Sequence, residues 1–421
     1  MSRPVAASSA LPRPVLAKNL SALMGAHAAG ILSTLLTVPY LARVLEPSGW
    51  APVLVAQALA NWMILILEFG FDLSGTRDVA RTRIAPDTMG PVVIGVQSAK
   101  LLLLGPTLLV FAGAIFAVPS LRADLRLSLA ALAVATARGL SPLWFFQGVE
   151  RVRRAVAIES GASVLAALGV FAVVHAPADG WRVVALQAFF SAVSLGLLTA
   201  KLSREVPMRR PDYRAGLATL RGARHIFGFR AAGGLLVQAN NLVMALLATP
   251  AVVAFFGGAE RIIRAAINLY LPLTRAIFPR VSFLSSADRH AARAAVVQLL
   301  LIMGGIGAIL AVGAYAGAPL LSRLLLGPGY EASIPVLRAL ALLPLIVAIT
   351  TVLGVWWALP FGHERALLRI IFWAGIVNVS LAMLMVPRWG ALGMASAVVA
   401  AETTVAVALW VLFISKREEE P

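Results

Sequence analysis

Cationic and amide side chains recur at helical spacing in the second half of the chain. Four of them fall at i, i+3, i+7 and i+14, on one face of a predicted helix over residues 252–280: Arg261, Arg264, Asn268 and Arg275. Charges inside apolar spans are costly, so they face either a partner or a water-filled cavity. This face could wall a cationic cavity that binds an anion. It could equally join an ion-pair network, because Glu260 lies four residues before Arg264.

Two other cations lie inside apolar segments without an adjacent acidic residue. Lys100 could extend its ammonium group to the cytoplasmic surface. Arg138 lies deeper, and the neighbouring Gly139 and Pro142 predict a kink in its helix. We assign Arg138 and Lys100 to the same predicted cationic cavity as the arginines of residues 252–280.

Amide side chains within the spans form a second candidate set. Gln57 and Asn61 share a helical face at i, i+4. Hydrogen bonding between helices is the ordinary role of such groups, and binding of sugar hydroxyls is the functional alternative. The candidate sugar contacts are Gln57, Asn61, Gln238, Asn240, Asn241 and Asn268.

Acidic and basic residues cluster where the second apolar segment ends, within residues 68–83. Opposite charges at this density favour an ion-pair network that gates the cavity. Coupling to an ion gradient would require a titratable group among them or in the later spans. The candidates for gating or coupling are Arg43, Glu68, Asp72, Arg77 and Glu260.

Several chemistries are not favoured by this sequence. The chain has no cysteine, which excludes disulfides, thiolate metal sites and cysteine catalysis. It contains no phosphate-binding loop, zinc motif or nucleophile triad. A polymerase, ligase or glycosyltransferase acting on a polyprenyl-linked sugar would usually need a long outer loop, whereas the predicted outer connection at residues 321–333 is short. We therefore expect no enzymatic activity, no metal and no cofactor.

Long apolar segments position these residues. The chain of 421 residues is 60% hydrophobic and 13% charged, with a mean hydropathy of +0.87. A bilayer core takes roughly 20 helical residues to cross, and continuous apolar segments indicate helices rather than barrel strands. We predict an all-α integral membrane protein with about twelve transmembrane helices, at residues 19–45, 50–71, 90–118, 126–147, 155–176, 181–202, 229–249, 252–280, 294–320, 333–360, 366–387 and 389–415.

The formal net charge of +17 has two readings. Nucleic-acid binding is the usual explanation of a basic chain. Here the positive-inside rule explains it better, because about 24 of the 36 Lys and Arg residues fall on one side of the predicted spans. We therefore expect no nucleic-acid partner, both termini in the cytoplasm, and contact between the basic loops and anionic lipids.

The chain divides into two similar halves. An N-terminal six-helix lobe (1–207) and a C-terminal six-helix lobe (229–421) flank a polar cytoplasmic linker (208–228), with a short helix near 216–224. Residues 148–151 (GVER) and 362–365 (GHER) recur 214 positions apart, each before an apolar span. Transporters built from such parallel repeats bind substrate between the halves and rock one half against the other.

Six short motifs, in this order along the chain, carry a family resemblance. They lie at residues 39–45, 56–78, 259–265, 278–280, 327–330 and 387–393. Together they resemble the bacterial flippases of lipid-linked oligosaccharides, which serve O-antigen and polysaccharide biosynthesis. These belong to the multidrug/oligosaccharidyl-lipid/polysaccharide (MOP) exporter superfamily, as do the MATE exporters.

The resemblance implies two six-helix lobes around a central cleft in the bacterial inner membrane. It implies that an undecaprenyl-diphosphate-linked oligosaccharide passes from the cytoplasmic to the outer leaflet by alternating access, for lipopolysaccharide or another surface glycan. Polysaccharide polymerase or ligase machinery would be its protein partner. Related flippases often carry a cation in the first span, where this chain has only His27. The second lobe would then supply most of the charge that binds the diphosphate.

A second function of the same fold is a MATE-like antiporter of small molecules or cations. Its cavity would be narrower and acidic. The charges within the spans of this chain are mostly basic, which favours an anionic lipid-linked substrate.

The charge distribution gives a topology that reporter fusions can test. Fusions after five positions should report the cytoplasm: Arg83, Arg154, Arg214, Arg289 and Arg365. Fusions after four others should report the outer side: Ser48, Arg122, Gly180 and Gly329. A reproducible inversion at one of these positions would contradict the predicted spans.

Overall fold

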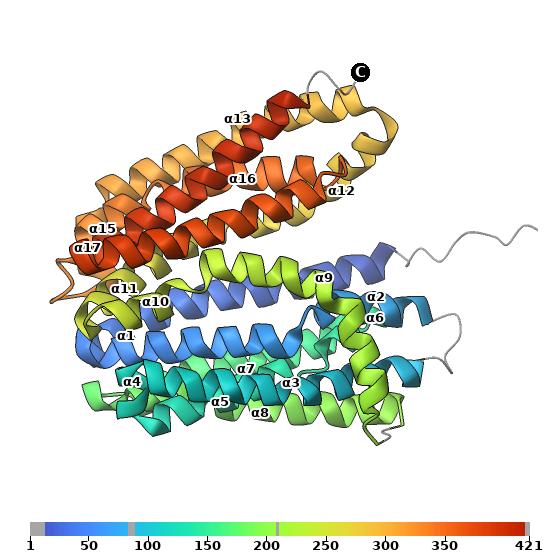
Figure 1. Ribbon diagram of the computed structural model, residues 1–421, viewed down its shortest axis with the longest axis horizontal. Coiled ribbons are helices and arrows are strands. Elements are labelled where there is room, and N and C mark those ends of the chain that lie inside the picture. The colour runs from blue at the N-terminus through green and yellow to red at the C-terminus, as the bar shows by residue number, and fades with distance from the viewer. Residues whose placement is uncertain (1–12, 83–88, 208–209, 417–421) are drawn as a thin grey trace, which may run out of the picture.

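The computed structural model describes residues 13–82, 89–207 and 210–416, and these residues form helices, turns and short loops without a β-strand. The elements, drawn in Figure 1, are α1 (Arg13–Glu68), α2 (Phe71–Thr82), α3 (Met89–Ala117), α4 (Pro119–Ala123), α5 (Leu125–Gly139), α6 (Leu143–Gly148), α7 (Val152–Val173), η2 (Pro177–Asp179), α8 (Gly180–Glu205), α9 (Tyr213–Val237), α10 (Asn240–Leu247), α11 (Pro250–Ile267), α12 (Tyr270–Ala287), α13 (Arg289–Ala316), α14 (Ala318–Leu321), η3 (Ser322–Leu326), α15 (Ser333–Leu340), α16 (Leu343–Thr350), η4 (Thr351–Ala358) and α17 (Glu364–Ser415).

Eight helical stretches of the described residues are long and apolar enough to cross a membrane. The predicted all-α membrane fold is confirmed. The two longest stretches each contain a sharp break, at Glu46 in α1 and at Gly390 in α17. The break at Glu46 falls between two predicted spans, and the break at Gly390 falls one residue inside the predicted start of the last span, at 389. The number of twelve crossings stays a prediction.

Proline and positive φ angles explain both breaks. Glu46 adopts φ 55° and ψ 172°, and the following residue, Pro47, disfavours helical geometry at position 46. Gly390 adopts φ 53° and ψ −128°, which glycine accepts at low cost, and Pro387 lies one turn earlier. The chain therefore reverses direction at each site with almost no loop.

The helices form two bundles. The N-terminal bundle comprises α1–α8 and the C-terminal bundle comprises α10–α17. Figure 1 shows them close together at the left of the view and diverging toward the right. One buried apolar cluster joins the bundles at their close end, with Leu54 and Met63 from α1 beside Phe256 from α11 and Val398 from α17.

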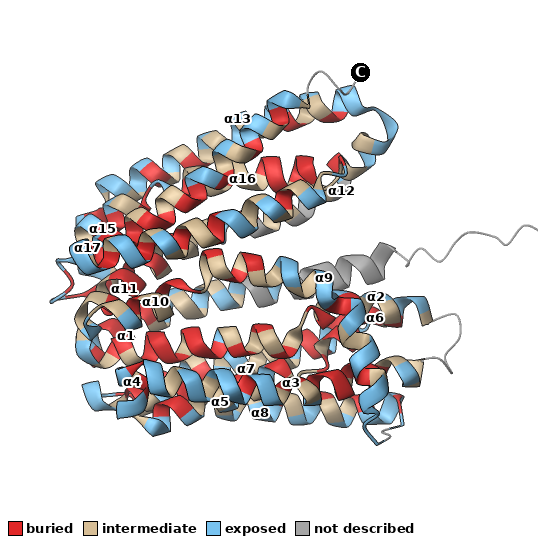
Figure 2. Cartoon of the chain, viewed as in Figure 1, coloured by how far each residue is buried: buried red, intermediate tan, exposed pale blue. Residues whose placement is uncertain are grey.

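The outer surfaces of the bundles remain apolar. Phe116 of α3 is 82% exposed and Leu301 of α13 is 75% exposed. Figure 2 shows the buried positions on the inner helix faces and the exposed positions on the outer ones. Exposed apolar surface on this scale is matched by lipid rather than water.

Helix α9 connects the two bundles. Its first part packs on α3, where Gly216 lies against Ser98 and Ala99, and its last part packs on α17, where Leu235 lies against Gly375. The helix runs without interruption from Tyr213 to Val237, so it is longer than the short helix predicted within the linker. The predicted boundary at residue 228 falls inside it, and the division into two lobes at that residue stays a prediction.

The predicted continuous helix over residues 252–280 was wrong in one respect. Helix α11 ends at Ile267 and α12 begins at Tyr270, with a turn between them. The i, i+14 relation between Arg261 and Arg275 therefore does not place the two residues on one uninterrupted helical face.

Candidate functional site

A cavity of about 940 Å³ lies between the bundles. Helices α1, α5, α6, α7 and α8 of the N-terminal bundle form most of its wall, and α11 of the C-terminal bundle completes it. Four charged residues line it, three of them cationic: Arg138, Glu159, Arg261 and Arg264. Its polar lining comprises Ser33, Thr34, Thr37, Gln57, Asn61, Gln147, Ser160, Ser163, Gln187, Ser191 and Asn268.

Arg261 reaches across the cavity from α11 to α1. Its Nη2 donates to Oε1 of Gln57, and the guanidinium lies 5.8 Å from the ring centroid of Trp50. Nε2 of Gln57 donates to Oε1 of Gln187 on α8 at 3.1 Å. A chain of hydrogen bonds therefore runs from the C-terminal bundle through two amides of the N-terminal bundle.

Arg264 is positioned by a buried carboxylate. Its Nη2 lies 3.3 Å from Oε1 of Glu260, one turn earlier on α11. The same carboxylate accepts from Nδ2 of Asn240 at 3.0 Å and from Nδ2 of Asn241 at 3.2 Å. Asn378 of α17 donates to Oδ1 of Asn240 at 2.9 Å. The anchored Glu260 holds Arg264 at the cavity wall, where 23% of its side chain is exposed.

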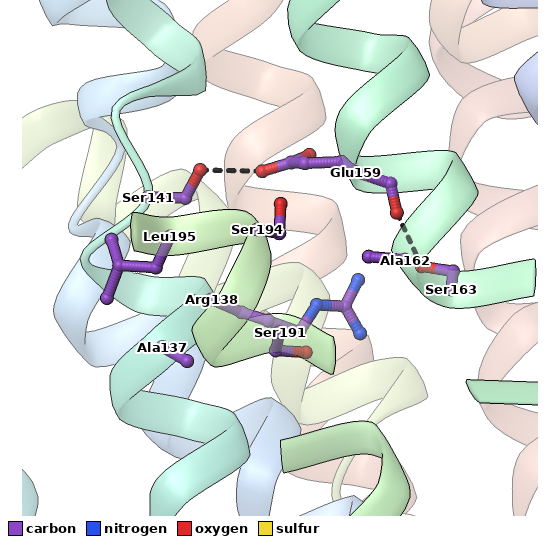
Figure 3. A pocket seen from close by; sticks show the side chains of 9 residues that line it. All are labelled: Ala137, Arg138, Ser141, Glu159, Ala162, Ser163, Ser191, Ser194 and Leu195. Atoms are coloured by element: carbon purple, nitrogen blue, oxygen red, sulfur yellow. Dashed lines mark hydrogen bonds between the residues drawn. The ribbon is translucent and has the colours of Figure 1, made fainter. Parts of the chain in front are cut away.

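Arg138 lies at the end of α5 and lines both the large cavity and a small side pocket of about 40 Å³. Figure 3 shows its guanidinium directed toward the serine-rich faces of α7 and α8. The Glu159 carboxylate turns away to accept from Oγ of Ser141 at 2.6 Å. Among the described residues, no hydrogen bond or ion pair occupies the Arg138 guanidinium. It is available to a ligand.

Lys100, predicted for the cavity, does not line it. Its side chain is buried, and Nζ donates to the carbonyl oxygens of Gly139 at 2.7 Å and Ser141 at 2.9 Å. These carbonyls belong to the break between α5 and α6, where the helical hydrogen bonds lapse. Lys100 stabilises this break, which in turn fixes the end of the helix that carries Arg138.

The predicted gate cluster is an ion-pair network that links α9 to the N-terminal bundle. Arg230 of α9 donates through Nη2 to Glu68 at 3.1 Å and through Nη1 to Asp72. Arg77 pairs only with its neighbour Asp78 among the described residues, and both are exposed. The network therefore ties the connecting helix to the start of α2, away from the cavity lining.

The close end of the bundles is sealed by aromatic side chains. Trp50 of α1 and Phe255 of α11 both pack on Tyr330, with ring centroids 6.2 and 6.0 Å apart. Burial raises the pKa of the Tyr330 phenol, with a smaller contribution from the Glu46 carboxylate, so the ring stays neutral. Arg43 adds a polar contact by donating to the Leu324 carbonyl.

The structure brings together part of the predicted site. Arg138, Arg261 and Arg264 line one cavity with Gln57, Asn61 and Asn268. Asn240 and Asn241 instead hold Glu260, and Gln238 caps the end of α9 outside the cavity. Arg275 lies on α12, and its side chain is outside the described part of the chain.

Several lining residues were missed. They are hydroxyl and amide side chains one turn apart in apolar helices: Ser33 and Thr37 on α1, Ser160 and Ser163 on α7, and Gln187 and Ser191 on α8. Their i, i+3 or i, i+4 spacing was a usable signal. Arg230 was missed because its partners lie more than 150 residues away.

A family model described as "Polysaccharide biosynthesis protein" matches residues 16–285, more than half of the chain. The chain belongs to this polysaccharide biosynthesis protein family. It is 24% identical over 407 residues to the "Putative O-antigen transporter" of Escherichia coli (strain K12), covering 95% of this chain and 96% of that protein. The protein of the same name from Shigella dysenteriae is 26% identical over 408 residues, covering 95% and 99%.

Two solved structures share the fold of this polysaccharide biosynthesis protein. An inward-facing MATE family multidrug transporter of the MOP superfamily matches with a TM-score of 0.67 and 16% identity, covering 91% of this chain and 94% of that chain. The lipid II flippase MurJ, in an inward closed conformation, matches with a TM-score of 0.64 and 13% identity, covering 94% and 86%. These two matches confirm the predicted MATE-like fold.

Lys100 and Arg138 should respond differently to loss of charge. Lys100→Met leaves the buried carbonyl of Gly139 without this donor, at about 1–3 kcal/mol, and the part-buried carbonyl of Ser141 at a smaller cost. We therefore expect less folded protein and a lower unfolding temperature in detergent. Arg138→Met is the matched control and should unfold near the wild-type temperature, because its guanidinium has no partner to lose among the described residues. Equal thermal stability of Lys100→Met and wild type would contradict the structural role of Lys100.

Proposed function

We propose that this protein moves an undecaprenyl-diphosphate-linked oligosaccharide from the cytoplasmic to the outer leaflet of a bacterial inner membrane. The observation that carries the proposal is the cavity of about 940 Å³, which combines three arginines with hydroxyl and amide side chains. Membership of the polysaccharide biosynthesis family supports it, as do the names of the O-antigen transporters and of the lipid II flippase that the chain resembles.

The two walls of the cavity suit the two polar parts of such a substrate. A diphosphate must cross a low-dielectric layer, and arginine forks offer its oxygens charge-assisted, bidentate hydrogen bonds. Arg261 and Arg264 present these forks from α11, and Arg138 faces the same cavity from α5. Asn61 and the hydroxyls of α1, α7 and α8 offer donors and acceptors to sugar hydroxyls.

Alternating access provides the route. With the predicted topology, the close end of the bundles faces outward and the cavity faces the cytoplasm. Rocking of the bundles would open the aromatic seal at Trp50 and Tyr330 and close the opposite end. The polyprenyl chain, which is as apolar as the lipid tails, would stay in the bilayer throughout.

A MATE-like cation antiporter is the alternative that the fold allows. Its substrate would meet three arginines in this cavity and a single carboxylate, Glu159, which already accepts a hydrogen bond from Ser141. Like-charge repulsion in a low-dielectric cavity would oppose binding of a cation. The balance of charge therefore favours the anionic lipid-linked substrate.

Deletion of the gene tests the function directly. We expect loss of surface glycan and accumulation of the lipid-linked unit in the inner leaflet, measured by glycan blotting and leaflet-specific labelling of extracted lipids. Accumulation of single units in the outer leaflet would indicate a polymerase or ligase instead. Undiminished display in a strain without another flippase would overturn the proposal.

Substitutions at Arg264 test the cationic wall. Lysine keeps the charge but loses the bidentate fork, and alanine removes both, so glycan display should fall in the order wild type, Arg264→Lys, Arg264→Ala at equal protein abundance. A purely structural role predicts another pattern. The paired change Glu260→Gln with Arg264→Gln would then restore both abundance and transport, and such rescue would exclude Arg264 from substrate binding.

A further inference from the structure

Gln57 of α1 lines the cavity and contacts Arg261 of the C-terminal bundle. Its carboxamide is used at both ends, because Oε1 accepts from Arg261 and Nε2 donates to Gln187. It is therefore less free than Asn61, one turn further along α1, to bind a sugar. Its place in the fold indicates another role.

Arg261 has a weak hydrogen-bond acceptor for a cation in an apolar setting. The neighbouring Glu260 carboxylate is taken by Arg264, Asn240 and Asn241. Among the described residues, the neutral amide oxygen of Gln57 is the only hydrogen-bond acceptor of the Arg261 guanidinium. Gln57 offers the guanidinium one neutral oxygen, whereas a diphosphate offers opposite charge and two oxygens that suit the bidentate arginine fork. An incoming diphosphate would therefore displace Gln57.

The contact that would be displaced also joins the two bundles. Gln57 belongs to α1, whereas Arg261 belongs to α11. One turn toward the sealed end, Leu54 is 2% exposed and packs against Gly257 so closely that a Cβ there would come within 2.6 Å of Leu54 Cδ1. The Arg261 guanidinium itself lies over Trp50, which is fully buried in the seal. We call this contact surface between α1 and α11, at the sealed end, the seam. Release of Arg261 would remove two of the interactions that hold it shut, the hydrogen bond to Gln57 and the contact with the Trp50 ring.

We propose that Gln57 is a substrate-displaced latch: it holds Arg261 against the closed seam, and a diphosphate that takes Arg261 from Gln57 releases the seam. This inference rests on the proposed function and adds the step that links anion binding to opening. The ligand shifts the equilibrium because it binds Arg261 only when the latch is open, which gives it different affinities for the two states.

Substitution of Gln57 can strengthen or remove the latch. Gln57→Glu is nearly isosteric and turns the contact with Arg261 into an ion pair, which should hold the seam shut against a diphosphate. Gln57→Leu removes the acceptor and should loosen the seam without any ligand. Gln187→Glu is the matched control: it adds the same charge to the cavity wall and still accepts from Gln57, but it does not contact Arg261.

The chain has no cysteine, so a single thiol at Leu54→Cys reports on the seam. We would measure its labelling rate by a maleimide in nanodiscs, with undecaprenyl diphosphate as ligand and undecaprenol as the control lipid. In the parent, the diphosphate should raise the rate about tenfold, within the usual range of coupling between sites, and undecaprenol should not. Gln187→Glu should show the same rise at a higher diphosphate concentration, because its added charge weakens anion binding in the cavity but does not contact Arg261. Gln57→Glu should abolish the rise, and Gln57→Leu should show a high rate without ligand.

Three outcomes would overturn the latch: a rise in Gln57→Glu equal to that of the parent, an unchanged basal rate in Gln57→Leu, or no rise in the parent. Surface-glycan display by the same Leu54→Cys parent, measured in the deletion strain, distinguishes failure of the latch from failure of the proposed function. If the parent restores display and any of the three results is found, the latch is rejected and the proposed function stands. Thermal unfolding of each variant identifies a change in labelling that comes from misfolding.

Discussion

The structure depends on one constraint: a charged group between apolar helices must find an acceptor or a wet cavity. Four cations among the helices satisfy this constraint in different ways. Lys100 uses the free carbonyls of a helix break, Arg230 pairs with two carboxylates, and Arg264 shares a carboxylate with two asparagines. Arg138 has no such partner among the described residues and faces the cavity. Lys100 and Arg230 lie outside the cavity lining and have structural contacts, whereas Arg138 and the partly exposed Arg264 line the cavity and can meet an anion.

Breaks in the helices create both the partners and the cavity. The α5–α6 break exposes the carbonyls that Lys100 binds, and the same break ends α5 at the level of Arg138. The positive φ angle at Glu46 returns α1 to the bundle, so that one element lines the cavity twice, before and after the reversal. The α5–α6 break therefore lies beside the cavity, whereas the reversal at Glu46 lies near Tyr330 at the closed end of the bundles.

The seam between the bundles combines dry packing with a few polar ties. The aromatic contacts of Trp50, Phe255 and Tyr330 exclude water, and such packing opens only when the whole surface separates. Polar ties are different, because a ligand can compete for each one separately. The seam therefore combines a packing surface that separates only as a whole with hydrogen bonds that a ligand in the cavity could break. The proposed alternating access would use both.

The sequence by itself determined the membrane class, the positions of most spans, the reversals near residues 46 and 390, and the cationic character of α11. Each of these follows from local composition and periodicity, because every membrane-spanning helix must be long enough, apolar enough and able to satisfy its own backbone hydrogen bonds. The tertiary structure alone decided which polar groups meet. Lys100 and Arg138 look alike in sequence, yet only Arg138 lines the cavity. Partners such as Arg230 with Glu68, and Arg261 with Gln57, lie 162 and 204 residues apart. Helical periodicity fixes the face on which a residue lies but not the helix that this face meets, and that choice arises only when the bundles pack.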